Sequence, residues 1–142
     1  MKSTEPDHAV ELRARPAVDD AELSALHAAA FGYRPHVVQS WTERLEEHSL
    51  TWVGAFDDGR MVGFANVAWD GGGHAFLLDV VVDPQRQGEG LGTSLVREAT
   101  RLAAETGCEW LHVDFLPEHA GFYLDRCGFA RSDAGVIRLA GF

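Results

Sequence analysis

A glycine-rich turn between an apolar strand and a helix constrains the fold of this chain more than any other feature. The segment reads "VVVDPQRQGEGLGTSLVREAT" from Val80 to Thr100. Gly88, Gly90 and Gly92 lie in the turn between the strand and the helix. Because glycine has no side chain, a ligand can approach the main chain closely there. The first N–H groups of a helix have no partner within it, and with the helix dipole they favour an anion. The turn therefore predicts an anion-binding α/β unit.

The spacing of these glycines excludes two common phosphate-binding motifs. A P-loop requires a lysine after its last glycine, and the sequence "GEGLGTS" has none. A dinucleotide fingerprint requires G-x-G-x-x-G, and here the third glycine is one residue out of register. The turn also lies too far along the chain to open a Rossmann unit. Neither ATP nor NAD chemistry is favoured by this turn.

The rest of the pattern predicts one domain, residues 1–142, with alternating strands and helices. Alternation and turn residues predict strands at 8–15, 51–56, 61–69, 75–82, 109–115 and 135–142. Apolar residues at helical spacing, with Asp19, Gly32 and Gly107 as caps, predict helices at 20–31, 35–48, 91–106 and 117–127. The strand "AFLLDVVV" is so apolar that we expect it to be buried on both faces.

Composition excludes several classes of protein. Acidic residues outnumber basic ones 22 to 12, giving a formal net charge of -10. This balance argues against nucleic-acid binding, which needs Lys and Arg, and suits a cationic small molecule. We expect no membrane contact and a cytoplasmic location, because no apolar run could span a bilayer and the first residues lack an apolar core. Cys108 and Cys127 suggest neither a disulfide scaffold nor a metal site.

The segment from Gln87 to Gly92, preceded by Val82-Asp83-Pro84, resembles the acyl-CoA-binding motif of the GNAT superfamily of N-acetyltransferases, [RQ]-x-x-G-x-[GA] after V-x-P. "LRARPAVDDAELSAL" is similar to the opening strand and helix of that superfamily, and "AGFYLDRCGF" to its late helix. The resemblance implies an α/β (α+β) fold. Its mixed, mostly antiparallel sheet would have six to seven strands and be flanked by about four helices.

The resemblance also implies acetyl-CoA as the cosubstrate. Its pyrophosphate would lie on backbone N–H groups between Gly88 and Thr93, and its pantetheine amides would pair with the strand edge before the turn. The implied cofactor-binding residues are Val80, Val81, Val82, Gln87, Gly88, Glu89, Gly90, Leu91, Gly92 and Thr93. The alternative is a glycine-rich helix start that binds no ligand.

The resemblance points to Tyr123 as the group that protonates the leaving thiolate. A phenol has a pKa near 10, above that of a thiol, so a well-placed tyrosine can donate to the sulfur. The alternative is that Tyr123, like Phe122, only packs against its neighbours. Many relatives carry an asparagine seven positions before this tyrosine, and here that position is Leu116. We therefore expect no asparagine contact to coenzyme A at this helix start.

Asp79 is the candidate base, since it interrupts the otherwise apolar strand "FLLDVVVD". An unpaired buried carboxylate is costly, and the resemblance puts Asp79 where many relatives carry a glutamate that takes the amine's proton. A raised pKa would suit that task, while a structural hydrogen-bonding role is an equal alternative. His112 and Asp114 share one face of their strand, which fits either a cleft or a polar sheet face. We expect His74 and His119 to be surface residues.

The resemblance to the GNAT superfamily also implies that acceptor specificity depends largely on the region between the first and second strands. Glu43, Glu46 and Glu47 beside Trp41 could hold an ammonium group, although they also fit a solvated helix face. We expect Trp52, Trp69 and Trp110 in the core.

Together these features predict an N-acetyltransferase that moves an acetyl group from acetyl-CoA to a small-molecule or peptide amine. Direct attack in a ternary complex is expected, because neither cysteine sits in a nucleophile context. The alternative is a catalytically inactive acyl-CoA-binding or regulatory module. We expect no metal and a monomer or homodimer.

Overall fold

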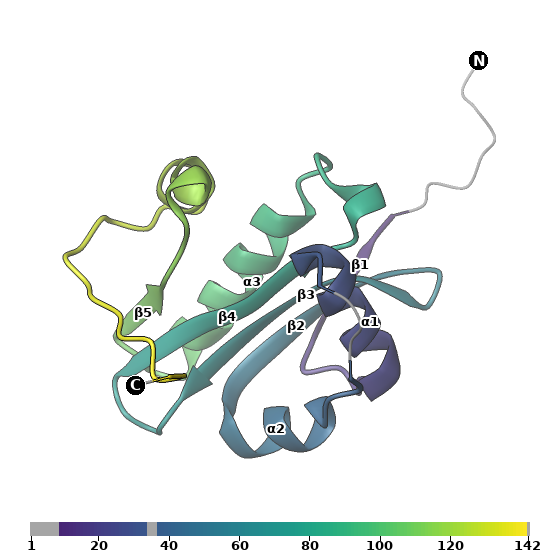
Figure 1. The fold of residues 1–142 in the computed structure, drawn as a ribbon, viewed down its shortest axis with the longest axis horizontal. Coiled ribbons are helices and arrows are strands. Elements are labelled where there is room, and N and C mark those ends of the chain that lie inside the picture. The colour runs from purple at the N-terminus through teal and green to yellow at the C-terminus, as the bar shows by residue number, and fades with distance from the viewer. Residues whose placement is uncertain (1–8, 34–36, 142) are drawn as a thin grey trace.

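The computed structural model describes residues 9–33 and 37–141, which form one five-stranded sheet with helices on both faces (Figure 1). The strands are β1 (Glu11–Ala14), β2 (Ser49–Asp57), β3 (Arg60–Trp69), β4 (His74–Val82) and β5 (Trp110–Val113), in that spatial order. Neighbouring strands are antiparallel except for β4 and β5, which are parallel. The mixed, mostly antiparallel sheet confirms the expected fold class.

Three α-helices cover the sheet. They are α1 (Asp20–Phe31), α2 (Trp41–His48) and α3 (Leu91–Glu105). Short turns of helix follow: η1 (Pro84–Arg86), η2 (Pro117–His119) and the π-helical η3 (Gly121–Arg126). The sequence caps α1 as expected, because the Asp19 carboxylate accepts a hydrogen bond from the Glu22 N–H at 2.8 Å and Gly32 takes φ +74°.

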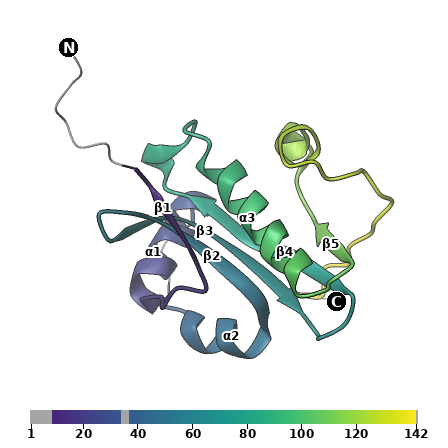
Figure 2. The same ribbon diagram turned by 180° about the vertical axis from the view of Figure 1, so that it is seen from behind.

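The sheet separates two hydrophobic clusters. On one face α3 buries Leu95, Val96 and Ala99 against β2, β3 and β4 (Figure 2). On the other face α1 and α2 bury Leu23, Trp41 and other apolar residues against Phe64. Within each strand the two faces alternate, so each face of the sheet receives its own set of apolar side chains.

The open part of β4 corrects one expectation. β4 was expected to be buried on both faces, yet Phe76 is 50% exposed and Leu78 44% exposed. The reason is that α1 packs on β3 and the second half of β4, and α2 on β2 and β3, so the first half of β4 and β5 stay uncovered on that face. Trp110 on β5 is 62% exposed for the same reason, so its predicted core position is wrong, whereas Trp52 is buried as predicted.

The sheet has five strands rather than six or seven, and the missing one is the predicted closing strand. Residues 135–141 form no strand, and Val136, Ile137 and Leu139 are each at least 75% exposed. A segment with strand-forming residues stays irregular where it has no ladder partner to satisfy its backbone.

The second helix begins later than expected. Residues 34–36 lie outside the described part of the chain, residues 37–40 are not helical, and Ser40 is the N-cap of α2. The first strand also begins later, at Glu11.

β4 carries a bulge that changes which way its side chains point. Leu78 pairs with Asn66 and Val81 pairs with Phe64, so Asp79 and Val80 together oppose a single β3 residue. A bulge of this kind shifts the alternation by one residue. As a result Leu77 and Val80 both lie on the α3 face, and Asp79 turns to the α1/α2 face.

Candidate active site

A cavity of about 680 Å³ lies where the end of β4, the glycine turn, the start of α3 and η3 meet. The pairing of β4 with β5 ends at Leu77 and Val113, and beyond this point the two chains diverge (Figures 1 and 2). The cavity lies against β4 beyond that split. Its lining residues are Val80, Val82, Arg86, Gln87, Gly88, Gly90, Leu91, Gly92, Thr93, His119, Phe122, Tyr123 and Arg126.

The glycine turn shapes one wall of this cavity. Gly88 and Gly90 take φ of +82° and +83°, a left-handed conformation that side chains disfavour. Gly92 has another reason to be glycine, because a Cβ there would lie 3.2 Å from two ring atoms of Phe122. The absent side chain lets η3 approach α3 closely. These glycines therefore keep open a cradle that larger residues would distort or fill.

The start of α3 presents backbone donors to the cavity. Gly90 is the N-cap, and no side chain caps this end. Ser94 N–H donates to the Gly90 carbonyl at 3.1 Å, which begins the helical ladder. The N–H groups of Leu91, Gly92 and Thr93 precede that bond and have no helical partner. Since all three residues line the cavity, an anion there would meet free donors and the positive end of the helix dipole.

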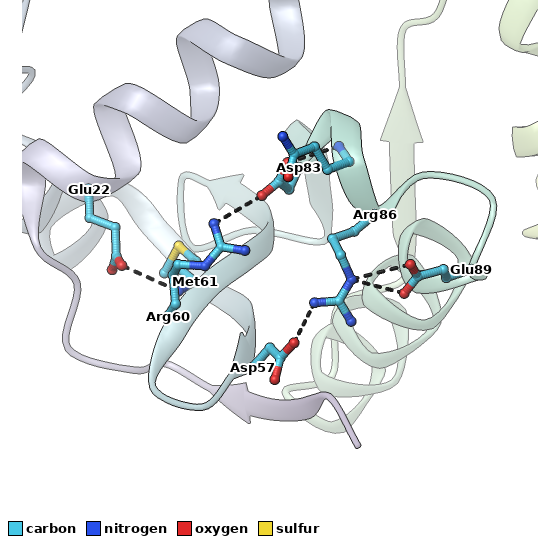
Figure 3. Close-up of polar contacts among 8 residues, drawn as sticks. Glu22, Asp57, Arg60, Met61, Asp83, Arg86 and Glu89 are labelled. Atoms are coloured by element: carbon cyan, nitrogen blue, oxygen red, sulfur yellow. Dashed lines mark hydrogen bonds and ion pairs between the residues drawn. The ribbon is translucent and has the colours of Figure 1, made fainter. Parts of the chain in front are cut away.

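Arg86 fixes the loop that leads into the turn (Figure 3). Its guanidinium donates to the Asp57 carboxylate at 2.5 Å and to both Glu89 carboxylate oxygens at 3.1 and 3.2 Å. The Arg86 side chain is only 18% exposed. Arg86 and Arg126 line the cavity, and no aspartate or glutamate does. Asp57 and Glu89 balance the charge of Arg86, so Arg126 is the lining cation with no carboxylate partner among the described residues, and it favours an anionic ligand.

Asp83 holds the other side of the same loop (Figure 3). Its carboxylate accepts from the Gln85 N–H at 2.9 Å and from Arg60 at 3.2 Å. Its own N–H donates to the Val62 carbonyl at 2.8 Å. The segment Val82-Asp83-Pro84 is thus held against β3 just before the glycine turn begins.

Tyr123 lies on the far wall of the cavity, on a single π-helical turn. Such turns often occur at functional sites because they reorient one side chain. Its ring stacks on Phe115 at 5.2 Å and meets Phe129 edge-on at 5.9 Å. Burial raises the pKa of Tyr123, and Cys127 adds a smaller rise. The phenol therefore keeps its proton at neutral pH, as a proton donor must.

Asp79 lies at the β4 bulge with φ +56° and a side chain that is 16% exposed. Arg44 donates to its Oδ2 at 2.7 Å, and Asn66 donates to the same oxygen at 3.3 Å. His27 Nε2 lies 3.0 Å from its Oδ1, and His27 Nδ1 lies 2.7 Å from the Tyr33 hydroxyl. The carboxylate is thus held by groups from α1, α2 and β3.

This setting fixes the charge of Asp79. Burial raises its pKa, but the hydrogen bonds from His27 and Asn66 and the charges of Arg44 and His27 together outweigh burial and lower it. The raised pKa that would suit a lone base is therefore not found. An ionised Asp79 accepts from His27, so a neutral His27 carries its proton on Nε2 and leaves Nδ1 as an acceptor.

The structure brings most of the predicted cofactor residues to one cavity. Two do not line it: Val81 packs on the α1 face with Phe64, and Glu89 pairs with Arg86. Asp79 also lies outside the lining, on the opposite face of β4 from Val80.

Sequence reasoning missed Arg86, His119, Phe122 and Arg126 as lining residues. Arg86 directly precedes the glycine motif, and Arg126 follows Tyr123 by three positions, which are the signals that could have found them. His119 was expected to be only a surface residue. His27 and Arg44 were not connected with Asp79, since nothing in the sequence relates positions 35 or more residues apart.

The other candidate residues from the sequence lie outside the cavity. His112 bonds His74 at 2.7 Å and lies on the uncovered part of the α1/α2 face, while Asp114 is exposed. Trp41 is fully buried beneath Arg44, whose guanidinium lies 4.2 Å from the ring centre. Glu43, Glu46 and Glu47 are exposed, so Trp41 cannot join them in a surface site for ammonium.

Replacing Asp79 with asparagine is expected to lower the free energy of unfolding by about 2 kcal/mol at neutral pH, since hydrogen bonds to a charged group are worth ~1.5–3 kcal/mol. The folded-state pKa of Asp79 is lowered, so its stabilisation is present above the unfolded pKa and is lost as pH falls through the folded pKa. Urea unfolding of both proteins at several pH values should show the difference shrinking below the ordinary aspartate range. The exposed Asp133→Asn is the control; a difference that is constant across pH contradicts this account.

Among residues 9–33 and 37–141, no helix has the length and apolar character to cross a membrane. In the same ranges, no three His, Cys, Asp or Glu side chains are arranged to hold a metal ion.

The fold and the cavity define a class of protein: an α/β domain in which strands β4 and β5 diverge beside a glycine turn and an uncapped helix start. The family model of the acetyltransferase (GNAT) family matches residues 16–129, and the chain belongs to that family. This confirms the resemblance drawn from the glycine motif.

Among curated proteins, the chain is 34% identical over 93 residues to mycothiol acetyltransferase from Nocardia farcinica (strain IFM 10152), covering 66% of this chain and 31% of that protein. It is 38% identical over 66 residues to glucosamine 6-phosphate N-acetyltransferase from Candida albicans, covering 46% and 42% of the two chains. The matched regions therefore span less than half of either relative.

Among solved structures, the chain resembles an aminoglycoside N-acetyltransferase determined in complex with CoA. The TM-score is 0.73 at 18% identity, and the match covers 96% of this chain and 97% of that chain. At this identity the likeness shows the fold.

Proposed function

We propose that this protein is an N-acetyltransferase that transfers the acetyl group of acetyl-CoA to a primary amine by direct attack in a ternary complex. The observation that carries the proposal is a single cavity that joins the glycine turn, the start of α3, the free edge of β4 and Tyr123. Family membership and a CoA-bound protein of the same fold support the choice of acetyl-CoA.

The cavity fits coenzyme A in three respects. Unpaired N–H groups at the start of α3 and the Arg126 side chain suit phosphate groups. The strand edge at Val80 to Val82 lies beyond the last β4–β5 pair, so its backbone groups are free to pair with the pantetheine amides. Phe122 and Leu91 supply an apolar wall for the pantetheine chain.

Acetyl-CoA supplies an activated acetyl group as a thioester, and the protein's residues perform two proton transfers around it. Tyr123 donates its phenolic proton to the thiolate as the carbon–sulfur bond breaks. Its raised pKa keeps it protonated until that moment. Both cysteines are free, and neither lines the cavity, which agrees with direct attack rather than a covalent enzyme intermediate.

The second transfer, removal of the amine's proton, is proposed for Asp79 acting with His27. The lowered pKa leaves Asp79 ionised but weak as a base by itself. An imidazole is a common general base, and a carboxylate on its other nitrogen fixes its tautomer. Asp79 is therefore the positioning residue, and His27 Nδ1 receives the proton through the Tyr33 hydroxyl, which lies 2.7 Å from it: the hydroxyl takes the amine's proton and passes its own to Nδ1.

The pH dependence of kcat/KM tests this division. In the wild-type protein kcat/KM should rise toward alkaline pH as the base loses its proton. Asp79→Asn should lower kcat/KM by about tenfold or more, since general base catalysis contributes ~10²–10⁴-fold, and should flatten that rise. If the pH profile of Asp79→Asn has the same shape as that of the wild type, Asp79 has a purely structural role.

Turnover distinguishes the enzyme from an inactive acyl-CoA-binding module. The assay is release of free CoA thiol from acetyl-CoA in the presence of a panel of primary amines, with acetylated product identified by mass spectrometry. Amine-dependent release above the rate with acetyl-CoA alone supports the transferase. Acetyl-CoA binding without release for any amine supports the module.

A further inference from the structure

A second hollow lies on the opposite face of β4 from the acetyl-CoA cavity. Its volume is about 700 Å³, and its lining includes Ala68, Phe76 and Leu78 together with the exposed residues His48, Asp70 and His74. Phe76 is 50% exposed and Leu78 44% exposed, which is unusual for large apolar side chains in the middle of a strand. We call this hollow the β4 groove.

The neighbours of Phe76 leave room for a flat ring. On the β5 side its register partner is His112, whose ring stacks on it at 4.8 Å with an interplanar angle of 19°. His112 is itself held by His74 at 2.7 Å. On the β3 side the register partner of Phe76 is Ala68, whose methyl group is too small to cover the ring. An aromatic ligand placed over Ala68 would meet Phe76 in the offset geometry that aromatic pairs prefer.

The charged residues of the β4 groove limit the kinds of ligand that it can bind. No lysine or arginine lines it, so it holds no permanent positive charge for a phosphate group. Its one carboxylate, Asp70, is exposed at the rim, which is too little for a ligand with several positive charges. The nearby Arg44 is already bound to Asp79 at 2.7 Å. The lining therefore suits an apolar body with at most one charge.

The β4 groove lies next to the proposed site of acetyl transfer along the strand. Leu78 lines the groove, Asp79 follows at the bulge, and Val80 lines the acetyl-CoA cavity on the other face. β4 has no β5 partner beyond Leu77, so the strand edge that β5 leaves unpaired starts at Leu78, which lines the groove. An amine at the Leu78 end would stand beside the Asp79–His27 pair.

We propose that the β4 groove binds the acceptor and selects arylalkylamines, with the aromatic ring against Phe76 and the amine directed toward Leu78 and Asp79. This inference rests on the proposed function, because it names the amine that the transferase uses. The ring recognition comes from one exposed side chain, which makes it testable without disturbing the core.

The test compares three acceptors at saturating acetyl-CoA: 2-phenylethylamine, glucosamine 6-phosphate and spermidine. We expect kcat/KM for 2-phenylethylamine to exceed the other two by tenfold or more. Phe76→Leu should lower kcat/KM for 2-phenylethylamine at least fivefold, mainly through KM, whereas the ring-retaining Phe76→Tyr should stay within twofold of wild type. The dissociation constant for acetyl-CoA should be the same in all three proteins.

Three results overturn the inference and leave the proposed function standing. The first is acetyl-CoA turnover with glucosamine 6-phosphate or spermidine in preference to 2-phenylethylamine. The second is an unchanged KM in Phe76→Leu. Sedimentation provides a further check: a dimer of the wild-type protein that Phe76→Leu dissociates would show that a second copy covers the groove, which also overturns it.

The groove can also be tested where the proposed function fails. Fluorine NMR of 4-fluorophenethylamine with the protein alone should show line broadening that Phe76→Leu abolishes. Absence of acetyl-CoA binding would reject the transferase, and absence of broadening would separately reject the groove as a site for arylalkylamines.

Discussion

Replacing Tyr123 with phenylalanine is expected to lower kcat by about a hundredfold, within the range of ~10²–10⁴ that a positioned general acid contributes. Tyr123 lies on the cavity wall with a pKa raised by burial, so only its hydroxyl proton is removed by this change. The aromatic contacts with Phe115 and Phe129 need only the ring and should survive. Acetyl-CoA affinity, measured by calorimetry, should therefore stay within about twofold of wild type.

The pH profile separates a chemical role of Tyr123 from a structural one. In the wild-type protein the activity should fall at alkaline pH only above the ordinary tyrosine pKa of about 10, because burial raises the Tyr123 pKa. Tyr123→Phe should lose that limb while keeping the melting temperature. A kcat within twofold of wild type would falsify the general-acid role.

Replacing Gly90 with valine is expected to weaken acetyl-CoA binding by tenfold or more. Gly90 holds φ +83° at the start of α3, where a β-branched residue costs about 1–3 kcal/mol, and its new side chain would stand where the phosphate groups approach. The protein should remain folded, because this cost is below the ~5–15 kcal/mol stability of a typical domain.

Gly107→Val is the matched control at the other end of the same helix. Gly107 has φ +87° and, like Gly90, open space where a Cβ would stand, but it does not line the cavity. Both variants should lose similar stability in urea unfolding, and only Gly90→Val should lose acetyl-CoA affinity. Equal affinities in the two variants would reject the glycine turn as the phosphate site.

Local patterns predicted the elements whose signals lie within a few residues. Asp58 and Gly59, at φ +50° and +79°, form the two-residue turn between β2 and β3 that their sequence indicates. The apolar face of α3 is also as predicted, with Leu91, Leu95 and Val96 buried. In such cases the turn chemistry and the hydrophobic period decide the structure without long-range contacts.

Predictions that depend on contacts between residues far apart in the sequence were less accurate. The closing strand at 135–142 has the right residues but no pairing in residues 135–141, and the exposure of Phe76 and Trp110 depends on where α1 and α2 end. The bulge at Asp79 reverses the side of the sheet that strict alternation would give it. Its partners His27 and Arg44 come from two helices that no local pattern connects to β4.

The candidate site likewise has features that local sequence predicts and features that depend on long-range contacts. The glycine motif and Tyr123 could be read from spacing and resemblance, and they line one cavity. The Arg86 clamp to Asp57 and Glu89 could not, because two of its three members are 29 positions apart. The role of Asp79 changes most, since its charge is set by neighbours that only the tertiary structure reveals.

Calorimetric titration of the protein with acetyl-CoA, with ATP and NAD as controls, tests the central claim most directly. The cavity at the start of α3 predicts one site with micromolar affinity for acetyl-CoA and no measurable heat with NAD or ATP at the same concentrations. Absence of acetyl-CoA binding, or equal binding of ATP, would contradict the account and leave the glycine turn as a helix start only.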